Sequence, residues 1–362
     1  MKIFYDHLIF SLQRYGGVSK YFCELLKNID KNKWYCPVLF SNNEYLESSD
    51  IIKQKDLFFH KNIKGKGRIM LELGKGYTVF SALKKKFDIY HQTHFDDFLL
   101  PFVKNKKIVT TFHDINFSRF PSKGFFWKNI VKQQQTIIDK ADKVIAVSHS
   151  TRADMLNTFS IDESKIVVIH HGVDKEKKEL KKERIIEQPY ILYVGLRKDF
   201  KNFNNFAKAF SIVCKKNKNI ELICTGKDFN KGEQAFLEEN NILSKAKVIA
   251  ASEQIMAMLY RDAEMFVYPS IFEGFGMPIL EAMVYSCPVV LSNSSCFPEI
   301  AQDAGIYFDP YNPEDIADKI LLVLEDSNLR NKIIKLGQER LAHFSWEKCA
   351  VEHMNVYKAL LY

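Results

Sequence analysis

Glu273 and Glu281 follow an apolar run, and Gly274, Gly276 and Pro278 lie between them. Because proline is favoured in the first turn of a helix, this segment predicts a strand, a glycine-spaced loop and a helix start. The glycines let backbone N–H groups approach a ligand closely, and the helix N-terminus adds partial positive charge. Together these features suit a phosphate group or a sugar hydroxyl.

The two acids also have simpler explanations. Glu281 falls in the first turn of the expected helix, where it could merely complement the helix dipole, and Glu273 could be an exposed loop acid. A pair of glutamates is also the catalytic set of many glycosidases. A glycosidase needs no group that grips a diphosphate, however, and both acids here lie beside one loop and the phosphate-type helix start that follows it.

The elements that must position these acids come from a pattern that spans the chain, in which short apolar runs alternate with helix-length segments. This alternation is typical of parallel sheets wound with helices. In the first half we predict strands at 3–5, 35–40, 88–92, 107–112, 143–147 and 166–170, and helices at 18–28, 125–139 and 150–159. In the second half we predict strands at 190–194, 220–224, 247–250, 265–268, 289–291 and 306–308, and helices at 203–215, 232–240, 252–261, 278–285, 314–325, 328–342 and 346–361. Residues 46–86 are rich in lysine and glycine, and their pattern assigns no element.

A highly charged segment separates the two halves. Residues 174–187 have few core-forming side chains, which is typical of a solvated connector. We therefore expect an α/β domain at 1–172, a linker at 173–187, a second α/β domain at 188–345 and a final helix at 346–362. In doubly wound sheets ligands bind beyond the carboxyl ends of the strands, so the strand-to-helix loops should hold the site.

Composition excludes several classes of protein. The 362 residues are 46% hydrophobic and 27% charged, which is typical of a globular protein with room for two cores. No apolar run approaches the roughly 20 residues that span a bilayer, and the first residues have no signal-peptide layout, so we expect a cytoplasmic protein. The seven cysteines are scattered without a C-x-x-C pair, which argues against a disulfide framework or a zinc cluster.

Basic charge is concentrated in the first half. Residues 1–172 hold 27 Lys and Arg against 17 Asp and Glu, a net charge of +10, whereas the rest of the chain has a net charge of −2. This imbalance suggests that the first half faces an anionic partner. A peripheral contact with an anionic membrane surface fits, and no nucleic-acid module is recognisable.

The Glu-x7-Glu loop resembles the signature of the retaining glycosyltransferases of family 4. Further motifs in the family's order extend the resemblance over nearly the whole chain: Tyr15-Gly16-Gly17-Val18, Phe112-His113-Asp114, Val147-Ser148-His149-Ser150, His171-Gly172-Val173-Asp174, the loop from Tyr193 to Asn202, and Phe344-Ser345-Trp346. The resemblance implies an α/β GT-B fold, in which two Rossmann-like doubly wound domains face each other across a cleft and a C-terminal helix crosses back to the first domain.

The resemblance also implies roles for charged residues. Arg197 and Lys201 match the cations that hold the donor diphosphate, which gains negative charge as the glycosidic bond breaks. Glu281 would accept hydrogen bonds from the ribose hydroxyls. Glu273 would lie near the donor sugar and act in catalysis. His113 would be the second catalytic residue, reaching the donor sugar from the first domain.

The glycine motifs would serve the same donor. Gly17 would bring backbone N–H groups to the donor phosphate, and the segment Gly274, Phe275 and Gly276 would contact the donor from the second domain. The implied reaction moves a sugar from a UDP- or GDP-linked donor to a saccharide or lipid-linked saccharide acceptor in surface polysaccharide synthesis. It needs no cofactor and no metal ion.

Alternatives remain on the same fold. A nucleotide-sugar epimerase, a sugar phosphorylase or a non-catalytic nucleotide-sugar-binding module would all retain a phosphate grip. Two departures from the family pattern also matter. Ser286 stands where the family has a helix-ending glycine, and either Arg197 or Lys198 could face the diphosphate. His170 and His171, adjacent on an expected strand, should point to opposite faces and so cannot share a metal ion.

Overall fold

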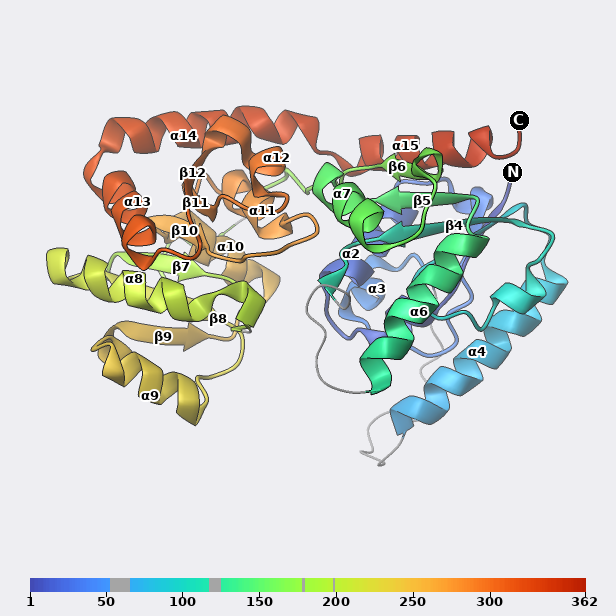
Figure 1. Cartoon of the computed structure of the whole chain (residues 1–362), viewed down its shortest axis with the longest axis horizontal. Helices are drawn as coiled ribbons and strands as arrows, with labels where there is room; N and C mark the ends of the chain where they lie inside the picture. The colour runs from blue at the N-terminus through green and yellow to red at the C-terminus, as the bar shows by residue number, and fades with distance from the viewer. Residues whose placement is uncertain (53–65, 117–124, 178–179, 198) are drawn as a thin grey trace. The chain divides into compact units, whose positions relative to one another are not determined.

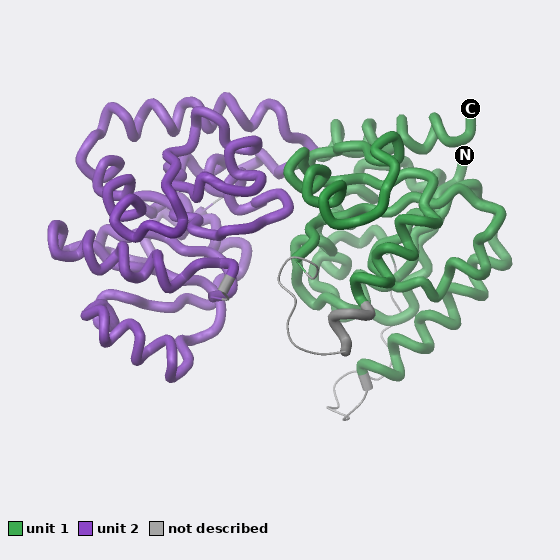
Figure 2. Tube along the Cα trace, viewed as in Figure 1, with its two compact units in different colours: residues 1–172, 346–362 green, residues 173–345 purple. Residues whose placement is uncertain are grey.

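The structure, a computed structural model, describes residues 1–52, 66–116, 125–177, 180–197 and 199–362. The chain forms two compact units, which Figure 2 colours separately. Unit 1 comprises Met1–Gly172 together with Trp346–Tyr362, and unit 2 comprises Val173–Ser345. The end of the chain therefore returns to the first unit, as the family resemblance implies.

Unit 1 is built on a six-stranded parallel sheet in the order β2-β1-β3-β4-β5-β6 (Figure 1). The strands are β1 (Ile3–Tyr5), β2 (Trp34–Tyr35), β3 (Ile89–Gln92), β4 (Lys107–Phe112), β5 (Lys143–Ala146) and β6 (Ile166–Val168). Every residue of β1 and β3 is buried, so the centre of the sheet is covered on both faces. The order is the flavodoxin-like form of a doubly wound sheet.

The helices of unit 1 include one from the far end of the chain. They are α1 (Leu8–Leu12), α2 (Gly17–Lys27), α3 (Glu44–Ser49), α4 (Lys66–Lys84), α6 (Phe125–Lys140), α7 (His149–Thr158) and α15 (Trp346–Ala359). Buried polar groups attach α15: the Tyr357 hydroxyl lies 3.0 Å from that of Tyr5, and the Tyr21 hydroxyl lies 2.6 Å from His353 Nε2. Unpartnered, these groups would be costly to bury, so the network specifies where α15 docks.

Unit 2 has a second six-stranded parallel sheet, in the order β12-β11-β10-β7-β8-β9. The strands are β7 (Tyr190–Tyr193), β8 (Glu221–Thr225), β9 (Ala246–Ile249), β10 (Met265–Tyr268), β11 (Val289–Ser292) and β12 (Gly305–Phe308). The helices are α8 (Phe203–Lys216), α9 (Lys231–Glu239), α10 (Glu253–Asp262), α11 (Met277–Val284), α12 (Phe297–Ala301), α13 (Pro313–Glu325) and α14 (Ser327–Arg340). Counted from β7, this is the strand order of dinucleotide-binding domains.

The predicted fold class is confirmed, and most predicted elements lie within two residues of those observed. One predicted strand, 35–40, is largely wrong, because the observed strand ends at Tyr35. Pro37 explains the early end, since proline cannot donate to a sheet ladder. The unassigned segment 46–86 contains most of α3 and all of α4. Among the described residues, no helix is both long and apolar enough to cross a bilayer.

Ser286, where the family pattern has glycine, adopts a left-handed backbone with a φ of 60° after α11. That conformation costs a non-glycine residue about 1–2 kcal/mol, whereas glycine loses more chain entropy on folding. We expect Ser286→Gly to raise the free energy of unfolding of unit 2 by about 0.5–1 kcal/mol. Calorimetry of both proteins would measure the change. A lower stability would show that the 3.4 Å hydrogen bond from Gln338 to the Ser286 hydroxyl outweighs the strain.

Candidate active site

The site of unit 2 lies where the winding of its sheet reverses. After β7, the chain adds β8 and β9 on one side of that strand. Strand β10 then pairs with β7 on its other side. At such a switch point the loops after the two strands diverge and leave a crevice for a ligand. The loop after β7 contains Arg197 and Lys201, and the loop after β10 contains Glu273. The topology therefore brings together the two loops that the sequence singles out.

Lys201 and Glu273 form an ion pair between these loops. Their side chains are 17% and 12% exposed, so solvent screens the pair only partly. Lys201 Nζ also lies 5.7 Å from the centroid of the Tyr268 ring, at the end of β10. The pair thus places a cation and a carboxylate side by side at the carboxyl edge of the sheet.

The main chain at Glu273 is held in place by Ser295. The Glu273 N–H donates to Ser295 Oγ at 3.1 Å, and the Ser295 hydroxyl donates to the Glu273 carbonyl at 2.6 Å. Ser295 adopts a left-handed backbone with a φ of 56°. Nothing in the sequence pattern singles out Ser295, because its role depends on a contact across 22 residues.

Helix α11 begins directly behind this loop. Its cap residue, Gly276, has a φ of 79°, and a Cβ built there would lie 3.1 Å from both Ile279 and Phe297. The first turn contains no acidic residue, so α11 itself has no carboxylate there to offset the positive end of its dipole. An anionic group beyond Gly276 would meet this end of α11.

Glu281 lies further into α11 than the sequence suggests. The helix starts at Met277, so Glu281 is in the second turn and not in the first. The predicted first-turn position of Glu281 is therefore wrong, and the simpler explanation as a helix-dipole partner loses its basis. Its Oε2 atom accepts a 3.5 Å hydrogen bond from the Tyr260 hydroxyl, and the side chain is half-buried.

Phe275 and Gly274 complete the loop as buried residues. The Phe275 ring, 4% exposed, contacts the Phe344 ring with the centroids 5.9 Å apart. The side chain therefore belongs to the core, and a donor could meet only the backbone of this stretch.

Arg197 pairs with a different acid from Lys201. Its Nε atom pairs with Glu233 at 2.9 Å, and its guanidinium donates to the carbonyls of Lys227 and Asp228. The guanidinium also lies 4.8 Å from the Phe229 ring centroid, and the side chain is only 6% exposed.

The two predicted diphosphate cations have different acidic partners: Lys201 pairs with Glu273, and Arg197 pairs with Glu233. Glu233 belongs to the capping box that Asn230 forms at the start of α9, a pattern that could have been found in the sequence. Lys198 lies outside the described residues.

Gly17 is the first residue of α2 in unit 1. A Cβ built on Gly17 would meet no atom within 4 Å, and no acidic residue lies in the first turn of α2. The Gln13 side chain caps the helix by accepting from the Ser19 N–H at 3.2 Å. Space for a ligand is therefore open beside Gly17, whereas Gln13 occupies the N–H of Ser19 and the space beside Gly16.

His113 follows β4 in unit 1 and lies among aromatic rings. Its ring centroid is 4.7 Å from that of Tyr21, 5.8 Å from that of Phe22 and 5.5 Å from that of His171. Burial lowers the pKa of His113 to about 3, so the imidazole is neutral at physiological pH. Both ring nitrogens are buried, and within the described part of the chain neither has a hydrogen-bond partner.

The buried histidines of unit 1 make its stability depend on pH. Burial lowers the pKa of His353 to about 4 and that of His113 to about 3, so each binds a proton far more readily in the unfolded chain. The contribution of these neutral histidines to the free energy of unfolding is complete above pH 6.5. It is lost as the pH falls towards their folded-state pKa values.

We expect the free energy of unfolding to fall by about 2 kcal/mol per histidine between pH 7 and pH 5. All three tryptophans lie in unit 1, so urea unfolding followed by tryptophan fluorescence measures this change. In His353→Gln the free energy of unfolding should depend less steeply on pH. A dependence as steep as that of the wild-type protein would contradict this prediction.

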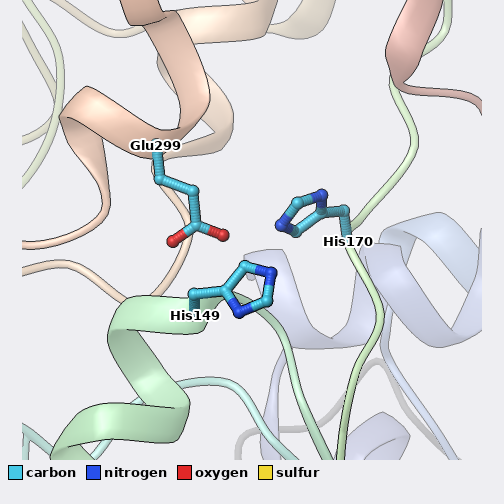
Figure 3. Close-up of side chains that lie close together, drawn as sticks. All are labelled: His149, His170 and Glu299. Atoms are coloured by element: carbon cyan, nitrogen blue, oxygen red, sulfur yellow. The ribbon is translucent and has the colours of Figure 1, made fainter.

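Two further histidines of unit 1 lie close together. The rings of His149 and His170 are 6.1 Å apart between centroids and nearly perpendicular (Figure 3). His171, by contrast, contacts Tyr21, so the adjacent histidines His170 and His171 face different surroundings. Glu299, also labelled in Figure 3, belongs to unit 2, where it lies in the first turn of α12.

Two family models match consecutive parts of the chain. Residues 15–177 match Glycosyltransferase Family 4, and residues 174–340 match Glycosyl transferases group 1. The chain is 30% identical to the O-antigen chain mannosyltransferase B of Escherichia coli over 286 residues, which is 74% of each chain. It is 24% identical to the capsular polysaccharide biosynthesis glycosyltransferase CapM of Staphylococcus aureus, over 66% of this chain and 67% of that protein.

Solved structures share the fold over nearly the whole chain. Sucrose-phosphate synthase from Thermosynechococcus elongatus matches with a TM-score of 0.77 and 17% identity, covering 100% of this chain and 99% of its own. The Anabaena protein HepE, solved in complex with UDP and glucose, matches with a TM-score of 0.77 and 17% identity, covering 99% of each chain. Identities this low establish the fold alone.

Proposed function

We propose that this chain, which belongs to family 4 of the glycosyltransferases, transfers a sugar from a nucleoside diphosphate donor to a saccharide hydroxyl during surface polysaccharide synthesis. The names of its relatives support this assignment, since they include an O-antigen mannosyltransferase and a capsular polysaccharide glycosyltransferase. The UDP in the HepE structure supports a nucleotide-linked donor.

The observation that carries the proposal is the Lys201–Glu273 pair at the switch point of unit 2. When the donor binds, Lys201 would exchange its carboxylate partner for a diphosphate oxygen, with the N-terminal end of α11 adding positive potential. Glu273, released from Lys201, would then accept hydrogen bonds from the donor sugar and stabilise positive character at its anomeric carbon. Glu281 would hold the ribose.

Arg197 takes a different role in this proposal from the one inferred from sequence. Its pairing with Glu233 supports a positioning function, in which it holds the loop between β7 and Lys201 against α9. On unit 1, the neutral imidazole of His113 would exchange a hydrogen bond with a saccharide hydroxyl. Its low pKa argues against proton transfer by His113.

We further propose that the reaction retains the anomeric configuration and proceeds without a metal ion. The bond from the anomeric carbon to the diphosphate oxygen breaks while the acceptor oxygen bonds to the same face of that carbon. The acceptor proton passes to the departing diphosphate oxygen. Lys201 and the helix terminus would supply the positive charge that this departing group requires.

For the acceptor we propose a lipid-linked saccharide, met in the cytoplasm at the inner face of the membrane. The net charge of +10 over residues 1–172 supports this location, because anionic lipids attract basic surfaces. The attraction should weaken as salt rises, since screening shortens its range.

A donor screen tests the function. The protein would be incubated with UDP- and GDP-linked sugars and a lipid-extract acceptor, and release of the nucleoside diphosphate would be measured with and without EDTA. We expect release that depends on the acceptor, resists EDTA and gives a product with retained configuration by NMR. Conversion of the donor without acceptor would indicate an epimerase, dependence on inorganic phosphate a phosphorylase, and binding without turnover a non-catalytic module.

A further inference from the structure

Helix α4 presents five large apolar side chains to solvent. Those of one face are 40–67% exposed and form what we call the outer stripe: Ile69 (62%), Leu73 (55%), Tyr77 (40%), Phe80 (53%) and Leu83 (67%). Their spacing of three or four residues puts them on one side of the helix. Figure 1 shows α4 as a long helix at the margin of unit 1. A surface helix of a globular protein normally has the opposite arrangement, with such residues against the core.

The opposite face of α4 anchors the helix through small residues. Gly74, Thr78 and Ala82, spaced four apart, are buried. The Thr78 hydroxyl lies 2.8 Å from Nδ1 of His7, and a Cβ built on Gly74 would lie 2.6 Å from His7 Nε2. Because the helix backbone fits this closely against His7, α4 cannot rotate to bury the outer stripe. The stripe is therefore fixed outwards.

Basic residues accompany the outer stripe. Residues 66–86 hold six Lys and Arg against a single acid, Glu72. Arg68, Lys84, Lys85 and Lys86 are exposed, and Lys84 Nζ lies 4.2 Å from the centroid of the Phe80 ring. An apolar stripe flanked by cations matches an anionic bilayer, whose headgroups are negative and whose interior is apolar.

We infer that α4 docks on an anionic lipid bilayer, with the outer stripe inserted at the boundary of headgroups and acyl chains and the basic residues against lipid phosphates. This inference rests on the proposed function, because it brings the enzyme to a lipid-linked acceptor. A second copy of the chain is a poorer occupant, since pairing two copies of segment 66–86, each of net charge +5, would bring like charges together.

Vesicle sedimentation tests the inference. The full chain would be mixed with two kinds of vesicle. One contains phosphatidylcholine alone, and the other also contains about 30% phosphatidylglycerol, which is an anionic lipid. We expect binding to the anionic vesicles that falls at least tenfold in Leu73→Ser/Phe80→Ser and in Lys84→Glu/Lys85→Glu/Lys86→Glu. The matched control is Leu322→Ser/Val351→Ser, which removes two exposed apolar side chains outside α4 and should bind as wild type does.

A second variant reports the depth of insertion. Tryptophan in Phe80→Trp should be quenched by brominated acyl chains in anionic vesicles, and quenching equal to that of the wild-type protein would overturn insertion at this residue. Equal vesicle binding by wild type and Leu73→Ser/Phe80→Ser would overturn docking through the stripe. A wild-type dimer that the same pair of substitutions converts to monomer, without vesicle binding, would assign the stripe to a second copy.

The tests separate this inference from the proposed function. Transfer to a soluble saccharide acceptor should be unchanged in the α4 variants, because no residue of the outer stripe belongs to the proposed donor site. If soluble transfer persists while vesicle binding is absent in wild type, the docking inference fails and the glycosyltransferase reaction stands. If soluble transfer is absent in every protein, the reaction proposed here fails.

Discussion

Replacing Lys201 by alanine is expected to lower kcat/KM for the nucleotide-sugar donor by about 10²–10³-fold. The ammonium group lies at the switch point of unit 2, paired with Glu273, where it can exchange that carboxylate for a diphosphate oxygen. Its charge matters most as the donor bond breaks and the departing diphosphate becomes more negative. Steady-state kinetics with varied donor would measure the loss, together with a raised donor KM.

A matched control is Lys208→Ala, which removes an exposed lysine of α8 outside the switch-point loops. It should leave both constants within about twofold of wild type, as surface substitutions usually do. Circular dichroism should show both variants folded. Equal kcat/KM in the two variants would remove Lys201 from the donor site, and with it the observation that supports the proposed reaction.

Replacing Glu273 by glutamine is expected to lower kcat by about 10²-fold with a different signature. The substitution keeps the size of the side chain but removes the charge that would oppose positive character at the anomeric carbon. It also frees Lys201 from its acidic partner, so donor affinity should be unchanged or tighter. Calorimetric titration of a non-reacting donor analogue would measure that affinity beside kcat.

The matched control for Glu273→Gln is Glu239→Gln, which changes an exposed acid at the end of α9. It should leave kcat and donor affinity unchanged. Weaker donor binding with an unchanged kcat would refute a role for Glu273 at the reacting carbon. Because Lys201 and Glu273 are in contact, the double variant should lose less activity than the two single losses combined.

Local sequence patterns were sufficient for most of the elements and for the loop that carries Glu273. The spacing of Gly274, Gly276 and Pro278 after an apolar run predicted a strand, a loop and a helix, and α11 begins within one residue of its predicted start. Short-range patterns succeed here because strand and helix periodicity and backbone conformation at glycine and proline depend on neighbouring residues. The fold class follows from the same alternation.

The sequence reading was incomplete where side chains choose partners far along the chain. Arg197 was grouped with Lys201, four residues away, but it pairs with Glu233 across 36 residues. Ser295 holds Glu273 across 22 residues, and Tyr357 meets Tyr5 across 352. Such pairs form only when the sheet has brought their loops together, so no local pattern encodes them.

The orientation of α4 separates most clearly what local sequence patterns predict from what tertiary packing determines. From the sequence alone, residues 46–86 suggested no element, because lysine and glycine interrupt the helical pattern. The composition determined a basic first half, and the spacing of Glu273 and Glu281 identified the family-type loop. Only packing against His7 decided that the face of α4 with small residues points inwards. The backbone of α4 approaches the His7 ring so closely at Gly74 that no larger side chain fits there. Tertiary contact thereby turned an ambiguous segment into an outward apolar stripe.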